Sequence, residues 1–556
     1  MHVNTRFRQW IAIFTVLLSA CGGGDGEVNT DNASDNGNIG FGPLATLDVT
    51  VPGIKTLLLS WPDATGETGY RVVEQLDGSP AAVEVASLPA DTTQHALSVF
   101  LPERLNARYS IQACNAAGCI AYTMVTTVTT AALNKAIGYF KPSANTLWGD
   151  SVFLSADGTT LAMSLPEDSS AAGDPNDTSV PDSGAVLVFT KGPTGWARQQ
   201  FIKDPAPAEN ARFGRSLALS ADGNRMAITS HGPRKVHLFE RVGGNWVQDT
   251  VLSDPRPLLL LGFAFKLALS GDGNTLAVGA DGSTDRPGFV FVYTRNAMGW
   301  QAPPQELMSD KYNDRYAQAL AISESGNTLL IGAPTSTADA PPATPGVVHV
   351  FTRSGGVWTQ QTRLIASNMG NGDGFGTSVA ISADGLTAAV GAMFEDSPAQ
   401  GIDGDQGNGR LNSGAAYVFV SRAGTWTQQG YIKASNASEF DEFGYALSLS
   451  ADGNSLAVGS RDEDGSGQGL DAGQDDTSAR AGAVYLFKRD EGTWRATRYI
   501  KAPNAEERDE FGAHVALSGD GQTLAVLAPG EDSAATGIGG DPSDNSAGAS
   551  GAIYLY

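Results

Sequence analysis

Short runs of alternating apolar and polar residues recur along most of this chain, and each pair of runs predicts a β-hairpin. In residues 443–460, two such runs flank an Asp-Gly pair, and an aromatic residue followed by Gly precedes them. Glycine supplies the positive φ of a tight turn, so this stretch is typical of one hairpin. An aromatic residue followed by Gly or Ala recurs seven times, each time with a glycine ten positions after the aromatic residue. The seven pairs are Trp148-Gly149, Phe213-Gly214, Phe263-Ala264, Tyr316-Ala317, Phe375-Gly376, Phe443-Gly444 and Phe511-Gly512.

Four apolar runs make up each complete repeat. In residues 375–435 the hairpin is followed by a third run at 414–420 and a fourth that begins at Trp426. Four antiparallel strands repeated seven times predict an all-β fold, in which residues 131–556 form a seven-bladed β-propeller. The last repeat ends after its third run, and residues 136–145 match the fourth run at 498–505 almost residue for residue. We therefore expect this N-terminal strand to complete the last blade and cover an otherwise exposed sheet edge.

Residues 44–130 contain six short strand-like runs and no helical stretch, which is typical of a β-sandwich. The runs at 57–61, 69–72 and 109–118 are similar to a fibronectin type III module. That resemblance implies that Trp61 and Tyr109 are core aromatic residues. The segment contains no Arg-Gly-Asp sequence, and we interpret it as a spacer without a partner of its own.

Cys114 and Cys119 bracket a four-residue turn between two of these strands. In an exported protein, two cysteines across a hairpin form a disulfide if their Cβ vectors agree. Two cysteines at this spacing can also supply half of the ligands of a metal site, but the chain has no second pair of cysteine ligands. We therefore favour the disulfide, with a small gain in stability because the closed loop is short.

The N-terminus predicts export to the cell envelope. Arg6 and Arg8 precede an apolar run that is too short to span a bilayer, so residues 1–20 are typical of a cleaved signal peptide. Residues 18–21, Leu-Ser-Ala-Cys, resemble a bacterial lipobox, which implies an acylated Cys21 at the outer membrane or cell surface. An ordinary signal peptide with an incidental cysteine is the alternative. Residues 21–43 predict a flexible acidic tether that reaches on the order of 25 Å.

The formal net charge of −24 argues against nucleic acid as a partner and favours cations or basic partners. We expect a monomer that is attached to the membrane through its lipid.

Residues 375–392, FGTSVAISADGLTAAVGA, resemble the FG-GAP repeats of integrin α-chain propellers. In that family the turn between the first two strands often carries a calcium loop. Here the turn is shortened to a few residues, too few to surround an ion with six or more oxygen ligands. We therefore expect these turns to be structural, without the metal sites of the family.

Acidic residues concentrate in four connections between second and third strands, at 166–183, 394–413, 461–480 and 530–550, which together hold 19 of the 60 Asp and Glu residues. Three of these loops begin with Glu-Asp-Ser, at Glu167, Glu395 and Glu531, and a closed ring makes the four blades neighbours. Three interpretations are open: solvated surface, Ca²⁺ bound within each loop, or electrostatic recognition of a basic partner. The best candidate Ca²⁺ ligands are Asp403, Asp405, Asp471, Asp475 and Asp476.

The sequence favours a binding protein over an enzyme. It contains no Gly-x-Ser-x-Gly, no His-Glu-x-x-His and no Gly-rich phosphate loop. We expect a non-catalytic envelope lipoprotein whose acidic propeller face binds a protein or glycan, as in adhesion. A periplasmic scaffold for envelope assembly is the first alternative. A hydrolase with its site on the propeller face is the second.

Overall fold

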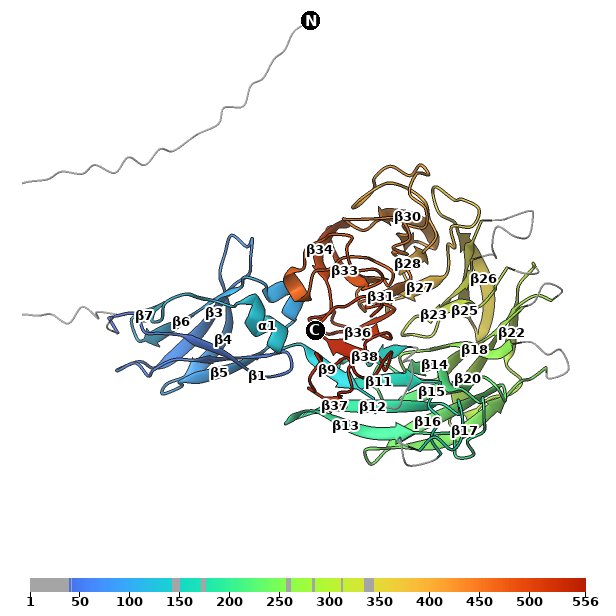
Figure 1. Cartoon of the computed structure of the whole chain (residues 1–556), viewed down its shortest axis with the longest axis horizontal. Helices are drawn as coiled ribbons and strands as arrows, with labels where there is room; N and C mark the ends of the chain where they lie inside the picture. The colour runs from blue at the N-terminus through green and yellow to red at the C-terminus, as the bar shows by residue number, and fades with distance from the viewer. Residues whose placement is uncertain are drawn as a thin grey trace, which may run out of the picture.

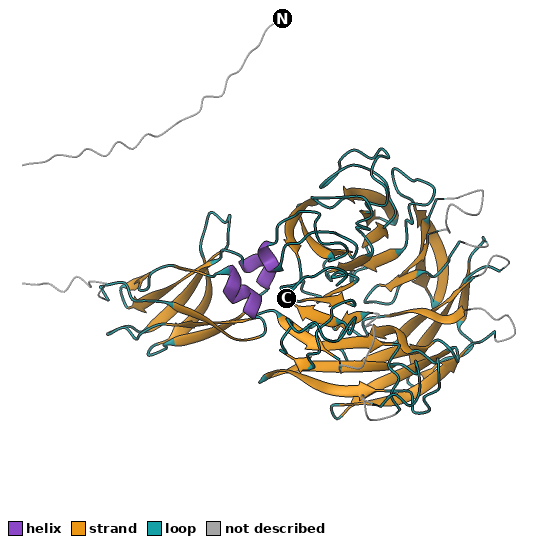
Figure 2. Cartoon of the chain, in the orientation of Figure 1, coloured by secondary structure: helices purple, strands orange, loops and turns teal. Residues whose placement is uncertain are grey.

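The computed structural model describes residues 40–41, 43–142, 151–171, 177–256, 262–282, 286–311, 314–334 and 345–556. The predicted lipidation site Cys21, the signal peptide and almost all of the tether lie outside the described residues, as do Trp148 and Gly149. Figure 1 shows a small N-terminal β domain beside a larger ring of sheets. Strands dominate both parts, with short helical segments where the two meet (Figure 2). Among the described residues, none of the helices has the length and apolar character needed to cross a membrane.

The N-terminal domain consists of two antiparallel sheets whose inner faces form one core. One sheet has the order β1-β2-β5, and the other has the order β4-β3-β6-β7 with β8 beside β6. Trp61 and Tyr109 are both buried in this core, and the Trp61 ring meets the edge of Tyr70 at 5.7 Å between centroids. Cys114 and Cys119 lie opposite each other on β6 and β7 and are joined by a disulfide. The strands are β1 (Asp48–Gly53), β2 (Thr56–Ser60), β3 (Gly69–Gln75), β4 (Val83–Pro89), β5 (Gln94–Ser98), β6 (Arg108–Asn115), β7 (Gly118–Ala121) and β8 (Thr126–Thr127).

Seven further antiparallel sheets follow one another in the described part of the chain. Their first strands contact one another around the whole ring, including the contact of β35 with β10 that joins the last sheet to the first. This is the arrangement of a β-propeller, and we number its blades 1 to 7 in that order. Blades 1 and 2 contain β10 (Val152–Leu154), β11 (Thr160–Leu165), β12 (Ala185–Gly192), β13 (Gly195–Ile202), β14 (Phe213–Leu219), β15 (Arg225–Ser230), β16 (Lys235–Val242) and β17 (Asn245–Ser253).

The remaining blades repeat this order, with small additions in blades 3 and 7. Blades 3 and 4 contain β18 (Gly262–Leu269), β19 (Thr275–Asp281), β20 (Phe289–Asn296), β21 (Gly299–Trp300), β22 (Gln305–Met308), β23 (Ala319–Ile322), β24 (Thr328–Ala333), β25 (Val347–Ser354) and β26 (Val357–Leu364). Blades 5 and 6 contain β27 (Ser378–Ile381), β28 (Thr387–Ala392), β29 (Ala415–Arg422), β30 (Thr425–Ile432), β31 (Ala446–Leu449), β32 (Ser455–Ser460), β33 (Ala483–Asp490) and β34 (Thr493–Ile500). Blade 7 contains β35 (His514–Leu517), β36 (Leu524–Ala528), β37 (Gly537–Ile538), β38 (Ala552–Leu555) and β9 (Gly138–Lys141).

The N-terminal strand β9 closes the ring, which confirms the expectation from the sequence. It pairs antiparallel with the C-terminal strand β38, with Tyr139 opposite Tyr554. Phe140 of β9 is fully buried, and its ring meets Phe189 and Trp196 of blade 1 edge-on. The first and last parts of the propeller are therefore held together by one shared sheet.

The aromatic–glycine pair that opens each repeat joins neighbouring blades. Phe443 is buried and packs its ring edge-on against Tyr485. Gly444 has a φ of +91°, and a Cβ there would lie 2.3 Å from the carbonyl oxygen of Ala415 in the preceding blade. Glycine adopts this conformation without strain and leaves room for the neighbouring carbonyl oxygen. Blades 3 and 4 place alanine there, and Ala264 keeps a positive φ of 67°.

The turns between first and second strands are structural, as their length predicts. In blade 6, Ser450 donates its hydroxyl to Asp452 Oδ1 at 2.5 Å, and the same carboxylate accepts the backbone N–H of Asn454 at 2.9 Å. Aspartate occupies this position in six blades, and Ser325 replaces it in the fourth. Each carboxylate therefore stabilises the turn in which it lies by hydrogen bonds.

The two-sheet domain packs directly on blades 6 and 7. Lys55 donates to Thr523 Oγ1 at 2.6 Å, and Arg498 donates to the carbonyl oxygen of Pro102 at 2.6 Å. Lys488 forms an ion pair with Glu103. Near this contact lie η1 (Leu101–Arg104), α1 (Thr130–Lys135) and η3 (Gly469–Asp471). One buried apolar cluster continues from the two-sheet domain into the last two blades, so the docking buries apolar surface as well as polar groups.

Candidate functional site

The long connections between second and third strands each begin with a buried carboxylate that pairs with a buried lysine. In blade 5, Lys433 Nζ lies 2.8 Å from Glu395 Oε2, and the two side chains are 0% and 1% exposed. Lys433 also donates to Ser413 Oγ at 2.7 Å. Glu395 accepts the hydroxyl of Tyr431 at 3.0 Å and the amide of Asn368 at 2.8 Å. Every oxygen of this carboxylate therefore has a donor.

The same pair recurs in all four blades that carry long loops. The other three pairs are Lys203 with Asp168, Lys501 with Glu463 and Lys141 with Glu531. The last of them links the N-terminal closing strand to blade 7. These four carboxylates are buried and paired, so they are not among the acidic loop residues that are available to a ligand.

The alignment of the first long loop also needs a correction. The sequence suggested that Glu167 corresponds to Glu395 and Glu531, because each begins a Glu-Asp-Ser triplet. In the structure Asp168 takes that place: it pairs with Lys203, and its carbonyl oxygen accepts the N–H of Gly184 just as Glu395 accepts that of Gly414. The triplet is shifted by one residue in blade 1.

A second buried carboxyl lies near each pair in blades 5, 6 and 7, in the link before the aromatic–glycine pair. Burial raises the pKa of Asp373 to about 6 and of Asp441 and Asp509 to about 7, and the nearby buried glutamate acts in the same direction. In Asp441, Oδ1 has no hydrogen-bond partner, while Oδ2 accepts the N–H of Ser438 at 2.6 Å. These three acids are buried in the blades and do not line the cavity described below.

In the loops 394–413 and 461–480, both fully described, the candidate Ca²⁺ ligands do not form a group of three with their oxygen atoms close together. Asp403 accepts the backbone N–H of Tyr431, and Asp405 accepts that of Gly407. Asp475 accepts from Ser466, and Asp476 accepts from the hydroxyl of Ser438. Asp471 is exposed at the end of η3. Calcium binding in these loops stays a prediction.

Across the described residues, one group of three acidic side chains brings its oxygen atoms within 4.8 Å of one another. It consists of Asp63, Glu67 and Asp91, in the two-sheet domain and far from the loops in the sequence. Asp63 accepts the hydroxyl of Tyr70 at 2.8 Å, and Glu67 accepts the N–H of Asp91 at 3.1 Å. These hydrogen bonds within the domain account for the cluster.

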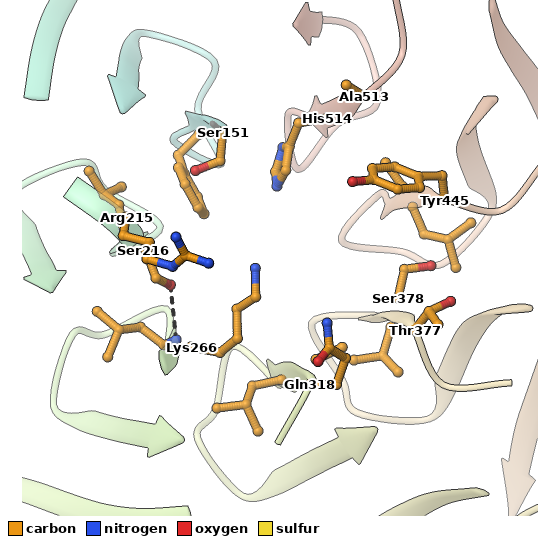
Figure 3. A pocket seen from close by; sticks show the side chains of 18 of the residues that line it. Ser151, Arg215, Ser216, Lys266, Gln318, Thr377, Ser378, Tyr445, Ala513 and His514 are labelled. Carbon is orange, nitrogen blue, oxygen red and sulfur yellow. Dashed lines mark hydrogen bonds between the residues drawn. The ribbon is translucent and has the colours of Figure 1, made fainter. Parts of the chain in front are cut away.

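A cavity of about 300 Å³ lies at the mouth of the central channel (Figure 3). Most residues that line it come from the start of the first strands of blades 1 to 7, two to four positions after the aromatic residue. Met393, just after the second strand of blade 5, also lines it. Since long connections leave from the ends of second strands, the cavity opens on the face that carries the long loops.

Three basic side chains line the cavity, although the protein as a whole is strongly acidic. Arg215, Lys266 and Arg315 line it, from blades 2, 3 and 4, and none of its described lining residues is Asp or Glu. In Figure 3 the side chains of Arg215, Lys266 and His514 extend toward the middle of the cavity from different sides. Burial lowers the pKa of His514 to about 4, and the positive charge of Lys266 acts in the same direction. His514 is therefore neutral at pH 7.

Sequence reasoning missed this cavity, although the repeats contain a signal for it. The second and third positions after the aromatic residue vary between blades, while the fourth position is Val or Leu in all seven. The second positions that line the cavity are Arg215, Gln318, Thr377, Tyr445 and Ala513, and blade 3 contributes Lys266 from its third position. Variable residues at a fixed place on a repeated scaffold indicate a site, but only the closed ring brings them to one cavity.

Two segments of the chain, residues 358–419 and 426–487, match the FG-GAP repeat family. The protein contains FG-GAP repeats within a β-propeller fold. Each matched segment runs from the fourth strand of one blade to the third strand of the next. No curated protein matches the chain.

Solved structures with similar folds are only distantly related in sequence. The β-propeller domain of Cps50 (Swd1) from Myceliophteria thermophila is 11% identical, with a TM-score of 0.44 over 76% of this chain and 99% of that one. Hydrazine synthase of Kuenenia stuttgartiensis is 13% identical, with a TM-score of 0.45 over 69% and 93%. The periplasmic gluconolactonase PpgL of Pseudomonas aeruginosa is 15% identical, with a TM-score of 0.40 over 79% and 98%. These likenesses concern the fold alone.

Proposed function

We propose that this protein is a non-catalytic binding protein of the cell envelope, and that its propeller takes a protein or glycan ligand on the face with the long loops. The observation that carries the proposal is the cavity of about 300 Å³ at the channel mouth, which opens on that face. A concave site with convergent polar groups is the usual form of a ligand site. The side chains that line the cavity differ from blade to blade although the scaffold repeats, which supports a role of the cavity in binding a ligand.

The rest of the chain supports presentation of that face at a membrane surface. The lipobox-like residues 18–21 favour an anchor at Cys21, and the following acidic segment favours a tether. The two-sheet domain, which we take as a fibronectin type III-like spacer, packs on blades 6 and 7 through contacts such as that of Lys55 with Thr523. A docked spacer holds the propeller in one orientation relative to the end of the tether.

A binding screen of glycans and matrix proteins against the full chain in detergent, with and without Ca²⁺, tests the proposal. The key variant is Ala513→Tyr, which fills the cavity. Blade 6 already carries Tyr445 at the corresponding position, so the scaffold accepts that side chain. We expect a ligand that the parent chain binds and the variant does not. If no ligand separates the parent from Ala513→Tyr, the cavity is not the binding site. A Ca²⁺ requirement would assign the acidic loops a part in binding.

A further inference from the structure

A second cavity, of about 190 Å³, lies between blades 5 and 6, and the residues that line it belong to the continuously described segment 345–556. It is bounded by Gly401 in the long loop of blade 5, Gln474 in that of blade 6, and residues 496–499 of β34. One water needs only about 10–15 Å³ of such space, so the cavity has room for a group of several heavy atoms. Small-molecule sites begin at about 300 Å³, so this one suits a single side chain of a larger partner.

Aromatic side chains form one wall of this inter-blade cavity, and hydrogen bonds hold them in place. Tyr485 and Phe487 are each 2% exposed, and Tyr499 is half-buried. The Tyr485 hydroxyl donates to Asn436 Oδ1 at 2.6 Å, and the Tyr499 hydroxyl donates to Glu463 Oε1 at 2.8 Å. The wall is therefore ordered before a ligand arrives, which lowers the entropic cost of binding.

The repeat of blade 5 shows which group fills the corresponding place. Phe375 and Phe443 open the repeats of blades 5 and 6, so residues 68 positions apart correspond. In blade 5, the side chain of Gln428 accepts the N–H of Ser367 at 3.0 Å and donates to Ser367 Oγ at 2.9 Å. Ser367 also donates its hydroxyl to Gln406 in the long loop at 3.0 Å. A carboxamide thus connects the fourth strand of blade 5 to the link that precedes the blade.

Blade 6 keeps the partners of that carboxamide and lacks the carboxamide itself. Ser435 and Gln474 correspond to the serine and the loop glutamine just described, and Gln474 donates to Ser435 Oγ at 2.8 Å. Position 496, which corresponds to Gln428, is an exposed alanine. Ala496, Ser435 and Gln474 all line the inter-blade cavity. The cavity is therefore the place that a glutamine side chain takes in the neighbouring repeat.

Acidic residues lie close in sequence to this cavity in both long loops. Four of them are exposed: Asp403, Asp405, Asp475 and Asp476. The last two directly follow Gln474, which lines the cavity. Carboxylates at the rim attract basic residues of a partner and disfavour acidic ones.

We propose that the inter-blade cavity is an anchor site for a protein partner and takes the side chain of a glutamine within a basic segment. The carboxamide of the partner binds the N–H and Oγ of Ser435, as Gln428 binds Ser367, and its methylene groups pack against the aromatic wall. An N-acetyl group of a sugar does not replace it, because a trans secondary amide directs its C=O and N–H to opposite sides. The proposal rests on the binding function argued above and adds a contact apart from the channel mouth.

Peptide binding to the full chain in detergent tests this site. The probes are short lysine-flanked peptides with a central Gln, matched peptides with a central Glu, Leu or Ala, and a Gln-centred peptide with glutamate flanks. The key variant is Ala496→Gln, which fills the cavity with the residue that blade 5 carries at this position, so the scaffold accepts it. The control is Thr493→Gln, which adds the same side chain at an exposed position of β34 outside the cavity. The melting temperature verifies that each variant folds.

We expect the lysine-flanked Gln peptide to bind at least about tenfold more tightly than its Ala counterpart, because the latter lacks two hydrogen bonds. Ala496→Gln should weaken its binding at least about tenfold, and Thr493→Gln should leave it unchanged. Tighter binding of the Glu, Leu or glutamate-flanked peptide would overturn the proposal, as would equal binding by the parent and Ala496→Gln.

The remaining outcomes separate this site from the proposed function. Absence of peptide binding at millimolar concentration, or a glycan whose binding is lost in Ala496→Gln, would also overturn the anchor site. If Ala513→Tyr abolishes the binding of a ligand from the screen and Ala496→Gln changes no binding, the proposed function stands and the anchor site is wrong. If Ala496→Gln weakens peptide binding and Ala513→Tyr changes nothing, the anchor site stands and the channel mouth is not the binding site.

Discussion

The buried lysine–carboxylate pair of blade 5 gives a quantitative prediction about stability. Replacement of Lys433 by Met removes a cation that lies 2.8 Å from Glu395 Oε2, with neither side chain more than 1% exposed. At an effective dielectric constant of about 20, the lost attraction is about 6 kcal/mol. The relief of lysine desolvation offsets several kcal/mol of it. The net expectation for breaking one side of such a pair is about 3–5 kcal/mol.

The remaining partners of Glu395 place the cost near the lower end of that range. Tyr431, Asn368 and the N–H of Ser397 still donate to the carboxylate after Lys433 is removed.

Urea unfolding of the full chain measures this cost as a shift in the transition midpoint. The double variant Lys433→Met with Glu395→Gln should recover most of the loss, because no uncompensated charge stays buried. The matched control is Arg495→Met, which breaks an ion pair with Asp490 whose side chains are 57% and 69% exposed. The control should cost no more than about 1 kcal/mol. If Lys433→Met shifts the midpoint no further than Arg495→Met, the pair is not the structural element inferred here.

Three further predictions concern pH, ring closure and backbone conformation. Burial raises the pKa of Asp441 to about 7 in the folded protein. Between about pH 4 and pH 7 the folded protein therefore retains a proton that the unfolded chain releases. The free energy of unfolding falls as the pH rises through this window. The variant Asp441→Asn should flatten that fall, and its free energy of unfolding at pH 8, measured with urea, should exceed that of the parent by on the order of 1 kcal/mol. The control variant Asp490→Asn, at an exposed position, should leave the pH profile unchanged. The variant Lys141→Met breaks the ion pair between the closing strand and blade 7. It should lower the melting temperature of the propeller and speed proteolysis of the N-terminal strand. Equal proteolysis of parent and variant would contradict the closure argument. The variant Ala264→Gly should stabilise the protein by about 0.5–1 kcal/mol, because a φ of 67° strains alanine. A loss of stability on thermal unfolding would show that the packing of the Ala264 methyl group outweighs this strain.

The sequence alone predicted the scaffold well because the scaffold is made of local patterns that recur. The aromatic–glycine pair, the turn glycine ten residues later and the alternating strands are read from a single repeat, and their recurrence revealed the rest. Closure by β9 was also predictable, because residues 138–141 repeat the last strand of blade 6. The docking of the two-sheet domain was not, since Lys55 and Thr523 are 468 residues apart and carry no shared pattern.

The acidic loops illustrate why charge counts mislead in a repeat protein. Glu395 and Lys433 lie 38 residues apart, and the lysine belongs to an otherwise apolar strand end, Tyr-Ile-Lys-Ala. In the sequence, Glu395 is one of several acidic residues in a loop, and Lys433 is a lysine at the end of a strand. In blades 5, 6, 7 and 1 the end of the fourth strand lies beside the start of the long loop, and this brings the lysine and the carboxylate together in the interior. The pairing is a tertiary property that spacing along the chain does not reveal.

The distribution of charge around the ring connects the two features of the loop face. The buried lysine–carboxylate pairs belong to blades 5, 6, 7 and 1, which carry the long connections, whereas the cations of the channel mouth belong to blades 2, 3 and 4. Lysine is thus used on one side of the ring to hold loops in place and on the other side to face the cavity.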